Sequence, residues 1–410
     1  MLYPASQGLS VNKLNTITVL AAGAVSSMNT LTLILLGISA IPFVYYAIAI
    51  FSCWRFFRRP IRQFPAGFTP PVSNLKPIRG LDPDAYENFA SFCRQDYPEY
   101  ELIFCVGDRE DPVLPLIDRL KREFPERPIR VLFGSGRDAS NDKVAKLARM
   151  VSEAAYEHVV ISDSDVRVRP DYLRKVVAPL ADPKIGAVTC FYLSIDERSF
   201  ADRLQSVGMM SDFYVGVVVA WQLDGVKFAL GPTIATTRER LAAFGGYEAI
   251  ENRPADDLLV GRMIADQGVE VELSRYPVET VADFHSIKEL IYKRLRWITV
   301  MRFMRPWGHF GLIFTHGLLW ALMAVVIHPT WTVAAIYLGT YFAVRCAITA
   351  MIAVWGLKQR GYWSKMALIP VWDAMAFGIW MASFARRSIR WRGSDYYIRG
   401  GTLVPANSGE

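Results

Sequence analysis

Long apolar stretches without charge place the strongest constraint on how this chain can fold. Residues 30–54 (TLTLILLGISAIPFVYYAIAIFSCW) contain no charged side chain and are long enough to span a bilayer. Residues 310–328 form a second stretch of this kind, and residues 331–357 form a third that only Arg345 interrupts. Between the first and second stretches lie roughly 250 residues of mixed, charged composition. The sequence therefore predicts a multi-pass integral membrane protein with a folded domain inserted between its anchors.

Basic residues around the first stretch predict its orientation. The segment RFFRRPIR, residues 55–62, follows it, whereas Lys13 is the only basic residue before it. By the positive-inside rule, residues 55–309 then lie in the cytoplasm. A fourth apolar stretch, residues 366–385, carries a proline and an aspartate, and a full span there would put the basic residues 386–410 outside. We therefore expect this stretch to be re-entrant or interfacial, and the tail to be cytoplasmic.

These features divide the chain into five parts. Residues 1–28 lack the basic region and cleavage site of a signal peptide, and we expect an N-terminal extension there. The other parts are a membrane helix at 29–54, a cytoplasmic domain at 55–309 with an interfacial helix at 286–305, C-terminal membrane helices at 310–385 comprising two spans plus one span or re-entrant segment, and a basic tail at 386–410. The five cysteines are scattered without a C-x-x-C pair, which fits a reducing compartment and argues against a zinc site.

Within the cytoplasmic domain, short apolar strands alternate with helical stretches. We expect strands at 71–80, 100–108, 129–134 and 159–161, with amphipathic helices between them. The strands are apolar almost without interruption, which is typical of strands covered by helices on both faces. The domain is therefore predicted to be α/β, with a mostly parallel central sheet.

Aspartates follow two of these strands directly. Asp108 ends the second strand, and Asp163 and Asp165 come after the strand at 159–161. In extended chain the side chains of residues i and i+2 point to the same side, so these two carboxylates repel each other unless a cation lies near. A single D-x-D is explained equally well by turn capping. Three acids at the carboxyl edge of a parallel sheet, where ligands bind, favour a functional site.

The acids indicate what such a site would hold. Mg²⁺ and Mn²⁺ are commonly bound by one or two carboxylates together with phosphate oxygens. The sequence contains neither a P-loop nor a G-x-G-x-x-G fingerprint. A nucleotide-sugar site requires neither motif, because carboxylates provide both the metal ligands and the base. Nothing in the chain indicates a nucleic-acid partner.

Two further stretches carry charge in a pattern. Asp256 and Asp257 open a helical pattern that ends at Gly268, where acids also favour the helix dipole without any catalytic role. A capping box, Ser286 to Glu289, opens a second helix. That helix could bind anionic lipid headgroups, clamp a diphosphate, or do both. Its basic residues are Lys288, Lys293, Arg294, Arg296, Arg302 and Arg305.

The order of these motifs resembles that of family 2-like membrane glycosyltransferases: an aspartate after a strand, a D-x-D, a further aspartate and (Q/R)-x-x-R-W. In this chain they are Asp108, SDSD, ADD and KRLRW. Longer stretches, among them LKPIRGLDPDAYENF, SDSDVRVRPDYL and IRWRGSDYYIRGG, are similar to glycosyltransferase family 21, the ceramide glucosyltransferases. The likeness runs from about residue 30 to 401. Bacterial hopanoid N-acetylglucosaminyltransferases share most of these motifs.

The resemblance implies a GT-A-type domain and a set of donor-binding residues. Asp108 would contact the uridine or ribose of a UDP-sugar. Asp163 and Asp165 would form the D-x-D, with Asp165 closest to Mg²⁺ or Mn²⁺. Lys76 and Lys143 would line the nucleotide pocket.

The same resemblance implies the residues of the reaction. Asp257, the second acid of ADD, would be the general base, while Arg296 and Trp297 would line the diphosphate and acceptor side. Lys293 stands at the first position of the (Q/R)-x-x-R-W pattern, which keeps the charge but loses the bidentate geometry of arginine.

The implied activity is inverting transfer of glucose from UDP-glucose to the primary hydroxyl of ceramide, giving β-glucosylceramide, at a bacterial inner membrane or a Golgi-like membrane. The alternatives are transfer from UDP-N-acetylglucosamine to a hopanoid polyol or another lipid, a processive polysaccharide synthase, and a non-catalytic lipid-binding scaffold. The acceptor would arrive from the bilayer, past residues 206–231 and the basic helix. A buried helix and strand explain residues 206–231 equally well.

Overall fold

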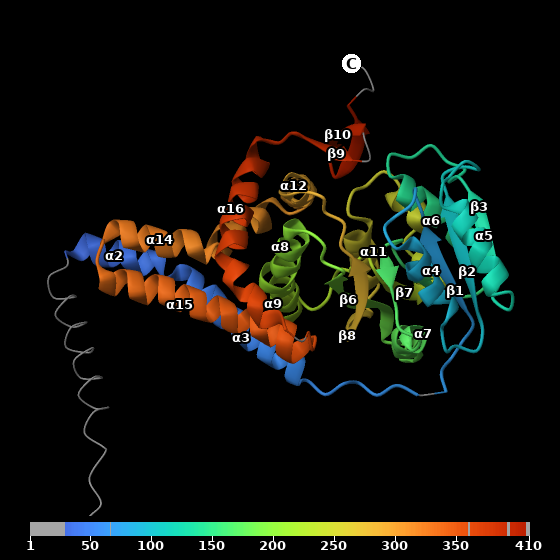
Figure 1. The fold of residues 1–410 in the computed structure, drawn as a ribbon, viewed down its shortest axis with the longest axis horizontal. Helices are drawn as coiled ribbons and strands as arrows, with labels where there is room; N and C mark the ends of the chain where they lie inside the picture. Colours follow the sequence, from blue (N-terminus) through green and yellow to red (C-terminus); the bar gives the residue numbers. More distant parts are fainter. Residues whose placement is uncertain (1–28, 66, 360, 392–393, 407–410) are drawn as a thin grey trace, which may run out of the picture.

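The computed structural model describes residues 29–65, 67–359, 361–391 and 394–406, and the predicted extension at 1–28 lies outside them. Figure 1 shows an elongated bundle of helices on one side and an α/β domain on the other. A third, smaller unit is a sheet formed by the C-terminal residues. The site is built where the α/β domain meets the helices that return from the bundle.

The bundle contains the apolar stretches of the sequence. In the part of the chain that the structure describes, four helices are long and apolar enough to cross a membrane: Thr30–Arg58, Phe200–Asp224, Trp331–Gly356 and Tyr362–Ala385. Their elements are α2 (Thr30–Ser39), α3 (Ile41–Arg58), α8 (Phe200–Gly208), η2 (Met209–Phe213), α9 (Tyr214–Asp224), α15 (Trp331–Ala350), η5 (Met351–Gly356), η6 (Tyr362–Leu368) and α16 (Ile369–Ala385). The stretch at 310–328 differs from a straight span. It consists of α13 (Pro306–Gly311), η4 (Leu312–Thr315) and α14 (Gly317–Ile327), with a bend of 53° at His316.

Helix α16 lies crosswise to the helices α2, α3, α14 and α15 rather than alongside them (Figure 1). Its C-terminal half packs against α12 (Ile287–Met304) and α13. There His309 Nε2 lies 2.9 Å from Ser383 Oγ, and Trp380 Nε1 donates to the His309 carbonyl at 2.8 Å. This orientation agrees with a re-entrant or interfacial segment, and the topology of residues 366–385 stays a prediction.

The domain contains an eight-stranded sheet with the order β3-β2-β1-β4-β7-β6-β8-β5. Strands β3, β2, β1 and β4 are parallel, as are β6 and β8, so the predicted mostly parallel sheet is confirmed. Strand β7 runs antiparallel to β4 and β6, and β5 antiparallel to β8. The strands are β1 (Val72–Pro77), β2 (Tyr100–Val106), β3 (Ile129–Phe133), β4 (His158–Ile161), β5 (Val166–Arg167), β6 (Ile185–Ile195), β7 (Ile234–Thr237) and β8 (Glu270–Val281).

Helices cover both faces of this sheet, which explains its apolar strands. Along β2, Leu102 and Phe104 face one core, and Ile103 and Cys105 face the other. The first core is completed by α4 (Ala85–Cys93), α5 (Leu114–Glu123) and α7 (Tyr172–Val177). The second is completed by α6 (Asp142–Glu153), α10 (Arg238–Ala242) and α11 (Asp256–Ala265). Two short 3₁₀ turns, η1 (Ala178–Ala181) and η3 (Tyr247–Ile250), complete the domain.

The C-terminal residues, which the sequence presented as a basic tail, form a folded unit. Strands β9 (Ser388–Trp391), β10 (Ser394–Arg399) and β11 (Thr402–Pro405) make an antiparallel sheet. Ile389, Ile398 and Leu403 are buried against Val300 of α12. The tail therefore returns to the α/β domain and packs against α12.

A third core joins the domain to the bundle, and the apolar run at 206–231 lies in it. Most of that run is helix, within α8, η2 and α9, and it is largely buried against α3, α15 and α16. Gly208 is what allows α16 to approach, because a Cβ there would lie 2.1 Å from the Trp372 ring. Gly216, on the same continuous helix, has nothing within 4 Å of such a Cβ.

This difference gives a matched pair of variants. Gly208→Ala should destabilise the protein by about 1–3 kcal/mol, because Trp372 must move to admit the methyl group. Gly216→Ala should be neutral or stabilise by up to about 1 kcal/mol, since alanine is the better helix former. Apparent melting temperatures in detergent would measure both. Equal melting temperatures of the two variants would show that Trp372 of α16 does not pack closely on Gly208.

Candidate active site

Three parallel strands set out the framework of the site. β1, β2 and β4 end at the same edge of the sheet, so the residues after each strand gather there. Asp163 and Asp165 follow β4, and the helices α6 and α11 begin beside them. The site thus takes its side chains from strand ends and helix starts, which hold them on rigid elements.

Lys143, in the first turn of α6, joins two of the predicted acids. Its Nζ lies 2.7 Å from Asp163 Oδ1 and 3.3 Å from Asp256 Oδ2. Burial alone would raise the pKa of Asp163, but the charge and hydrogen bond of Lys143, together with the charges of Lys76 and Lys293, outweigh it and the pKa is lowered. The same two carboxylates outweigh the effect of burial on Lys143 and raise its pKa. Asp163 is therefore held as an anion by a charged lysine.

Lys76 comes from β1 and is fully buried beneath the D-S-D turn. Its Nζ donates to the Asp163 carbonyl at 2.9 Å and to Ser162 Oγ at 3.3 Å, and lies 3.6 Å from the centre of the Phe92 ring. Burial lowers the pKa of Lys76 to about 7, against the pull of Asp163 and Asp165. Lys76 thus fixes the backbone that presents the two aspartates.

Asp257 lies close to Asp163 although the two are far apart in sequence. The backbone N–H of Gly231 donates to Asp257 Oδ2 at 3.1 Å. A Cβ on Gly231 would lie 3.2 Å from Asp163 Oδ2 and 3.3 Å from Asp257 Oδ2, so the two carboxylates flank this glycine. Burial, and then the neighbouring Asp256, raise the pKa of Asp257 to about 6, while Lys143 opposes them.

The residue before this pair has an unusual backbone. Ala255 has φ +57° and ψ +56°, in the left-handed region that costs a non-glycine residue about 1–2 kcal/mol. The left-handed turn starts α11 abruptly, and so sets the direction in which Asp256 and Asp257 leave the chain. Strain of this kind persists only where neighbouring contacts fix it.

Asp165 is a second acid of the site whose pKa is raised. Burial, and then the charge of Asp163, raise the pKa of Asp165 to about 6, while Lys293 of α12 opposes the shift. The Asp165 carbonyl accepts a hydrogen bond from Val281 N at 3.1 Å, which ties the D-S-D turn to the end of β8. A neighbouring acid, Asp82, also enters the site: burial raises its pKa, and a hydrogen bond with Ser164 opposes this. Asp82 was missed in the sequence, although it follows β1 as Asp108 follows β2.

The predicted residues of α12 divide into two groups. Lys293 faces the acids, and its Nζ lies 4.8 Å from the centre of the Phe284 ring. Arg296 is one turn further along and helps to lower the pKa of Lys293, after the larger effect of desolvation. Arg294 turns instead towards the bundle, where its Nε donates to Gln205 Oε1 at 2.9 Å. The Trp297 ring lies between the two sides, 5.8 Å from Lys293 Nζ and 5.1 Å from the Arg294 guanidinium.

Asp108, which was also predicted for the site, lies apart from the other acids. It is exposed, and its Oδ1 accepts a hydrogen bond from Glu110 N at 2.8 Å within its own turn. At the usual strand spacing, β2 lies roughly 10 Å from β4. Asp108 is therefore at the rim of the edge, where its contact with a uridine stays a prediction.

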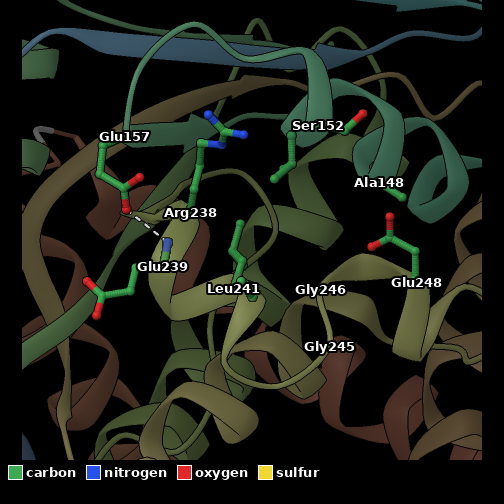
Figure 2. A pocket seen from close by; sticks show the side chains of 11 residues that line it. Ala148, Ser152, Glu157, Arg238, Glu239, Leu241, Gly245, Gly246 and Glu248 are labelled. Atoms are coloured by element: carbon green, nitrogen blue, oxygen red, sulfur yellow. Dashed lines mark hydrogen bonds between the residues drawn. The ribbon is translucent and has the colours of Figure 1, made fainter.

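The described residues also include a surface hollow away from these acids. Figure 2 shows this hollow, of about 610 Å³, between α6, α10 and η3. Its wall includes Glu157, whose carboxylate accepts from Glu239 N at 2.9 Å. None of the predicted site residues lines it, so it does not belong to the site.

The acids of the site offer few ligands to a divalent cation. Within the described parts of the chain there is no group of three or more His, Cys, Asp or Glu side chains arranged to hold a metal ion. Asp163 and Asp165 offer two carboxylates from one turn. Such a set fits Mg²⁺ or Mn²⁺ that takes its other ligands from a diphosphate and water, and not a cage made by protein alone.

Comparison with known proteins gives the family. The model of Glycosyl transferase family 21 matches residues 34–404. The chain belongs to this family. Ceramide glucosyltransferase 3 of Caenorhabditis elegans is 23% identical over 352 residues, covering 82% of this chain and 74% of that one. Ceramide glucosyltransferase of Komagataella phaffii is 31% identical over 157 residues, covering 36% and 30%.

Solved structures give the fold. A mannosyltransferase from Pyrobaculum calidifontis, solved with GDP-Man and Mn²⁺, matches with a TM-score of 0.56 and 20% identity, covering 86% of this chain and 99% of that one. The predicted GT-A-type α/β fold is thereby confirmed. Family and fold together make this chain a glycosyltransferase related to the ceramide glucosyltransferases.

The close approach at Gly231 gives a direct test of the site in this family 21 enzyme. Gly231→Ala should lower glycosyl transfer by roughly tenfold, because its methyl group would displace the carboxylates of Asp163 and Asp257 by a few tenths of an ångström. The melting temperature should change little. Transfer rates beside those of Gly216→Ala would measure the effect, and an unchanged rate would mean that the two carboxylates need not keep this separation.

Proposed function

We propose that this enzyme transfers glucose from UDP-glucose to the primary hydroxyl of ceramide, with inversion at the anomeric carbon, to give β-glucosylceramide. The observation that carries the proposal is Asp257, a partly buried carboxylate whose pKa is raised to about 6 and which flanks Gly231 opposite Asp163. A general base works best when its pKa lies near the working pH. The names of the relatives support glucose as the transferred sugar and ceramide as the acceptor.

The reaction would be a single displacement. Asp257 takes the proton of the lipid hydroxyl as its oxygen attacks the anomeric carbon. The bond from that carbon to the β-phosphate oxygen breaks on the opposite face, and UDP leaves with the electron pair. Because one displacement inverts the centre, an α-linked donor gives a β-glycoside.

The donor side would be formed by the charges at the sheet edge. Asp163 and Asp165 would hold Mg²⁺ or Mn²⁺, which would neutralise charge on the leaving diphosphate. Lys143 and Lys76 keep the D-S-D turn in place, and Asp108 would reach the uridine or ribose from the rim. Arg296 and Lys293, with Trp297 beside them, would face the diphosphate and the entering acceptor.

The acceptor would enter from the bilayer along α12 and α13. Tyr292, Trp307 and Phe310 are exposed there, with 86% of Trp307 accessible. Exposed aromatic side chains among arginines and lysines are typical of a helix that lies at a membrane interface. A cytoplasmic α/β domain would then have its site just above the headgroups.

The first experiment compares donors and acceptors with the purified protein in detergent and Mn²⁺. Glucosylceramide should form from ceramide and UDP-glucose, and Asp257→Asn should reduce kcat by a factor of about 10²–10⁴ because the base is lost. Asp266→Asn, at the exposed end of the same helix, is the matched control and should be unaffected. If the enzyme transfers sugar only from UDP-N-acetylglucosamine to a hopanoid polyol, the proposed mechanism stands but the proposed donor and acceptor are wrong. If Asp257→Asn keeps full activity, Asp257 is not the base.

The pKa of Asp257 predicts how the rate depends on pH. Only the ionised carboxylate accepts a proton, so kcat/KM should be highest above pH 6 and should fall as the pH drops through about 6. Below that point the decrease should approach tenfold per pH unit. A pH profile of kcat/KM for UDP-glucose measures this, because kcat/KM reports the pKa of the enzyme before the donor binds. Constant activity down to pH 5 would contradict it.

A further inference from the structure

The loop that leads into the proposed base is fixed from two sides. This loop, residues 251–255, ends at the strained Ala255. On one side, the start of α6 contacts it: Asn141 N donates to the Glu251 carbonyl at 3.0 Å, and Asn141 Nδ2 donates to the Arg253 carbonyl at 3.0 Å. On the other side lies β11 of the C-terminal sheet. The strand is thus the second support of the turn from which Asp257 projects.

Leu403 is the residue of β11 that makes these contacts. Its backbone N–H donates to the Asn252 carbonyl at 2.7 Å, and its carbonyl accepts from Ser140 Oγ at 3.2 Å. Asn252 Oδ1 in turn accepts from Ser140 N at 2.9 Å. A single residue therefore joins the segment before α6, which carries Lys143, to the segment before α11, which carries Asp257.

The Leu403 side chain extends the same connection to α12. It is 2% exposed and lies in a small core with Ile389, Ile398 and Val300, against which Ala255 packs. Val300 belongs to the helix that carries Lys293 and Arg296. All three helices that contribute charges to the site thus meet at this sheet, although the chain reaches it only after passing through the bundle.

We propose that the C-terminal sheet, through Leu403, is a positioning element for the catalytic acid loop. This inference rests on the proposed role of Asp257. The sheet holds the left-handed turn at Ala255 in place, so that Asp257 keeps its alignment beside Gly231. Among the described contacts it touches the loop before Asp257 directly but neither Asp163 nor Asp165, so we expect its loss to affect proton transfer much more than donor binding.

The test separates turnover from donor binding in the full-length protein. Leu403→Ala should lower kcat roughly tenfold, because a small displacement of a reacting group has a large effect on rate. The KM for UDP-glucose, and the affinity for UDP with Mn²⁺ by calorimetry, should stay within about twofold. Leu403→Met should keep kcat close to that of the wild type, since methionine has nearly the same side-chain volume as leucine. Val404→Ala, the next residue, whose side chain faces the other way along the strand, is the matched control and should behave as wild type.

A second variant covers the case in which Leu403→Ala fails to fold. Ser140→Ala removes only the hydrogen bond to the Leu403 carbonyl and should lower kcat in the same direction by a smaller factor. Unchanged kcat in both variants, or equal loss of kcat and UDP affinity, would overturn the positioning role. Asp257→Asn is measured in parallel. If it stays active, the proposed base is wrong; if it is inactive while Leu403→Ala is normal, only the role of the sheet fails.

Discussion

Repulsion among carboxylates that are brought close together is the constraint on which this site depends. Asp163, Asp256 and Asp257 come from a strand end and a helix start, and Lys143 from a third element lies between the first two, at 2.7 and 3.3 Å. Without that ammonium the acids would have to take up protons or move apart. The charges are balanced only when β4, α6 and α11 are all in place. Assembly of the site and completion of the second core are therefore one event.

In the bundle, the ion pair between Arg345 and Asp373 likewise holds separate elements together. Arg345 Nε lies 2.9 Å from Asp373 Oδ2, the Tyr341 hydroxyl donates to the same oxygen at 2.7 Å, and Arg345 also donates to the Ser211 carbonyl. Ser211 lies in a π turn, where the change in helical pairing leaves a carbonyl available to a side chain. Charges in an apolar environment are tolerated when they are paired in this way. The pair thus joins α15, α16 and the buried helix at 200–224.

That buried helix transmits the arrangement of the bundle to the site. Gln205 accepts from Arg294 of α12, and Gly208 lets Trp372 of α16 lie against the helix. The position of Lys293, one residue before Arg294, is therefore set by contacts inside the bundle. The KRLRW motif serves two purposes, since Lys293 faces the acids and Arg294 faces the helices of the bundle.

Features that depend on a local residue pattern could be predicted from the sequence. The parallel sheet was visible in the unbroken apolar strands, and the aspartates at the strand ends in their spacing. The residue pattern did not show the proximity of Asp163 and Asp257, which only the family resemblance implied. Their proximity depends on Gly231, where the lack of a Cβ has no local signature. The bend at His316 and the folded tail were also missed. Both arise from packing against distant elements, and the basic residues of the tail hid the apolar Ile389, Ile398 and Leu403, which lie one on each of its three strands.

Asp165 and Asp257, whose pKa values are both raised to about 6 by burial and a neighbouring acid, would respond in opposite ways to a bound donor. Asp165 is raised by burial and by Asp163, and a divalent cation bound at the D-x-D would lower its pKa, so that it remains ionised. Asp257 is raised by burial and by Asp256, and the negative diphosphate would add to that effect. Donor binding would therefore leave one carboxylate fully charged as a ligand and make the other a stronger base. The separation of the two roles follows from which charge lies nearest to each acid.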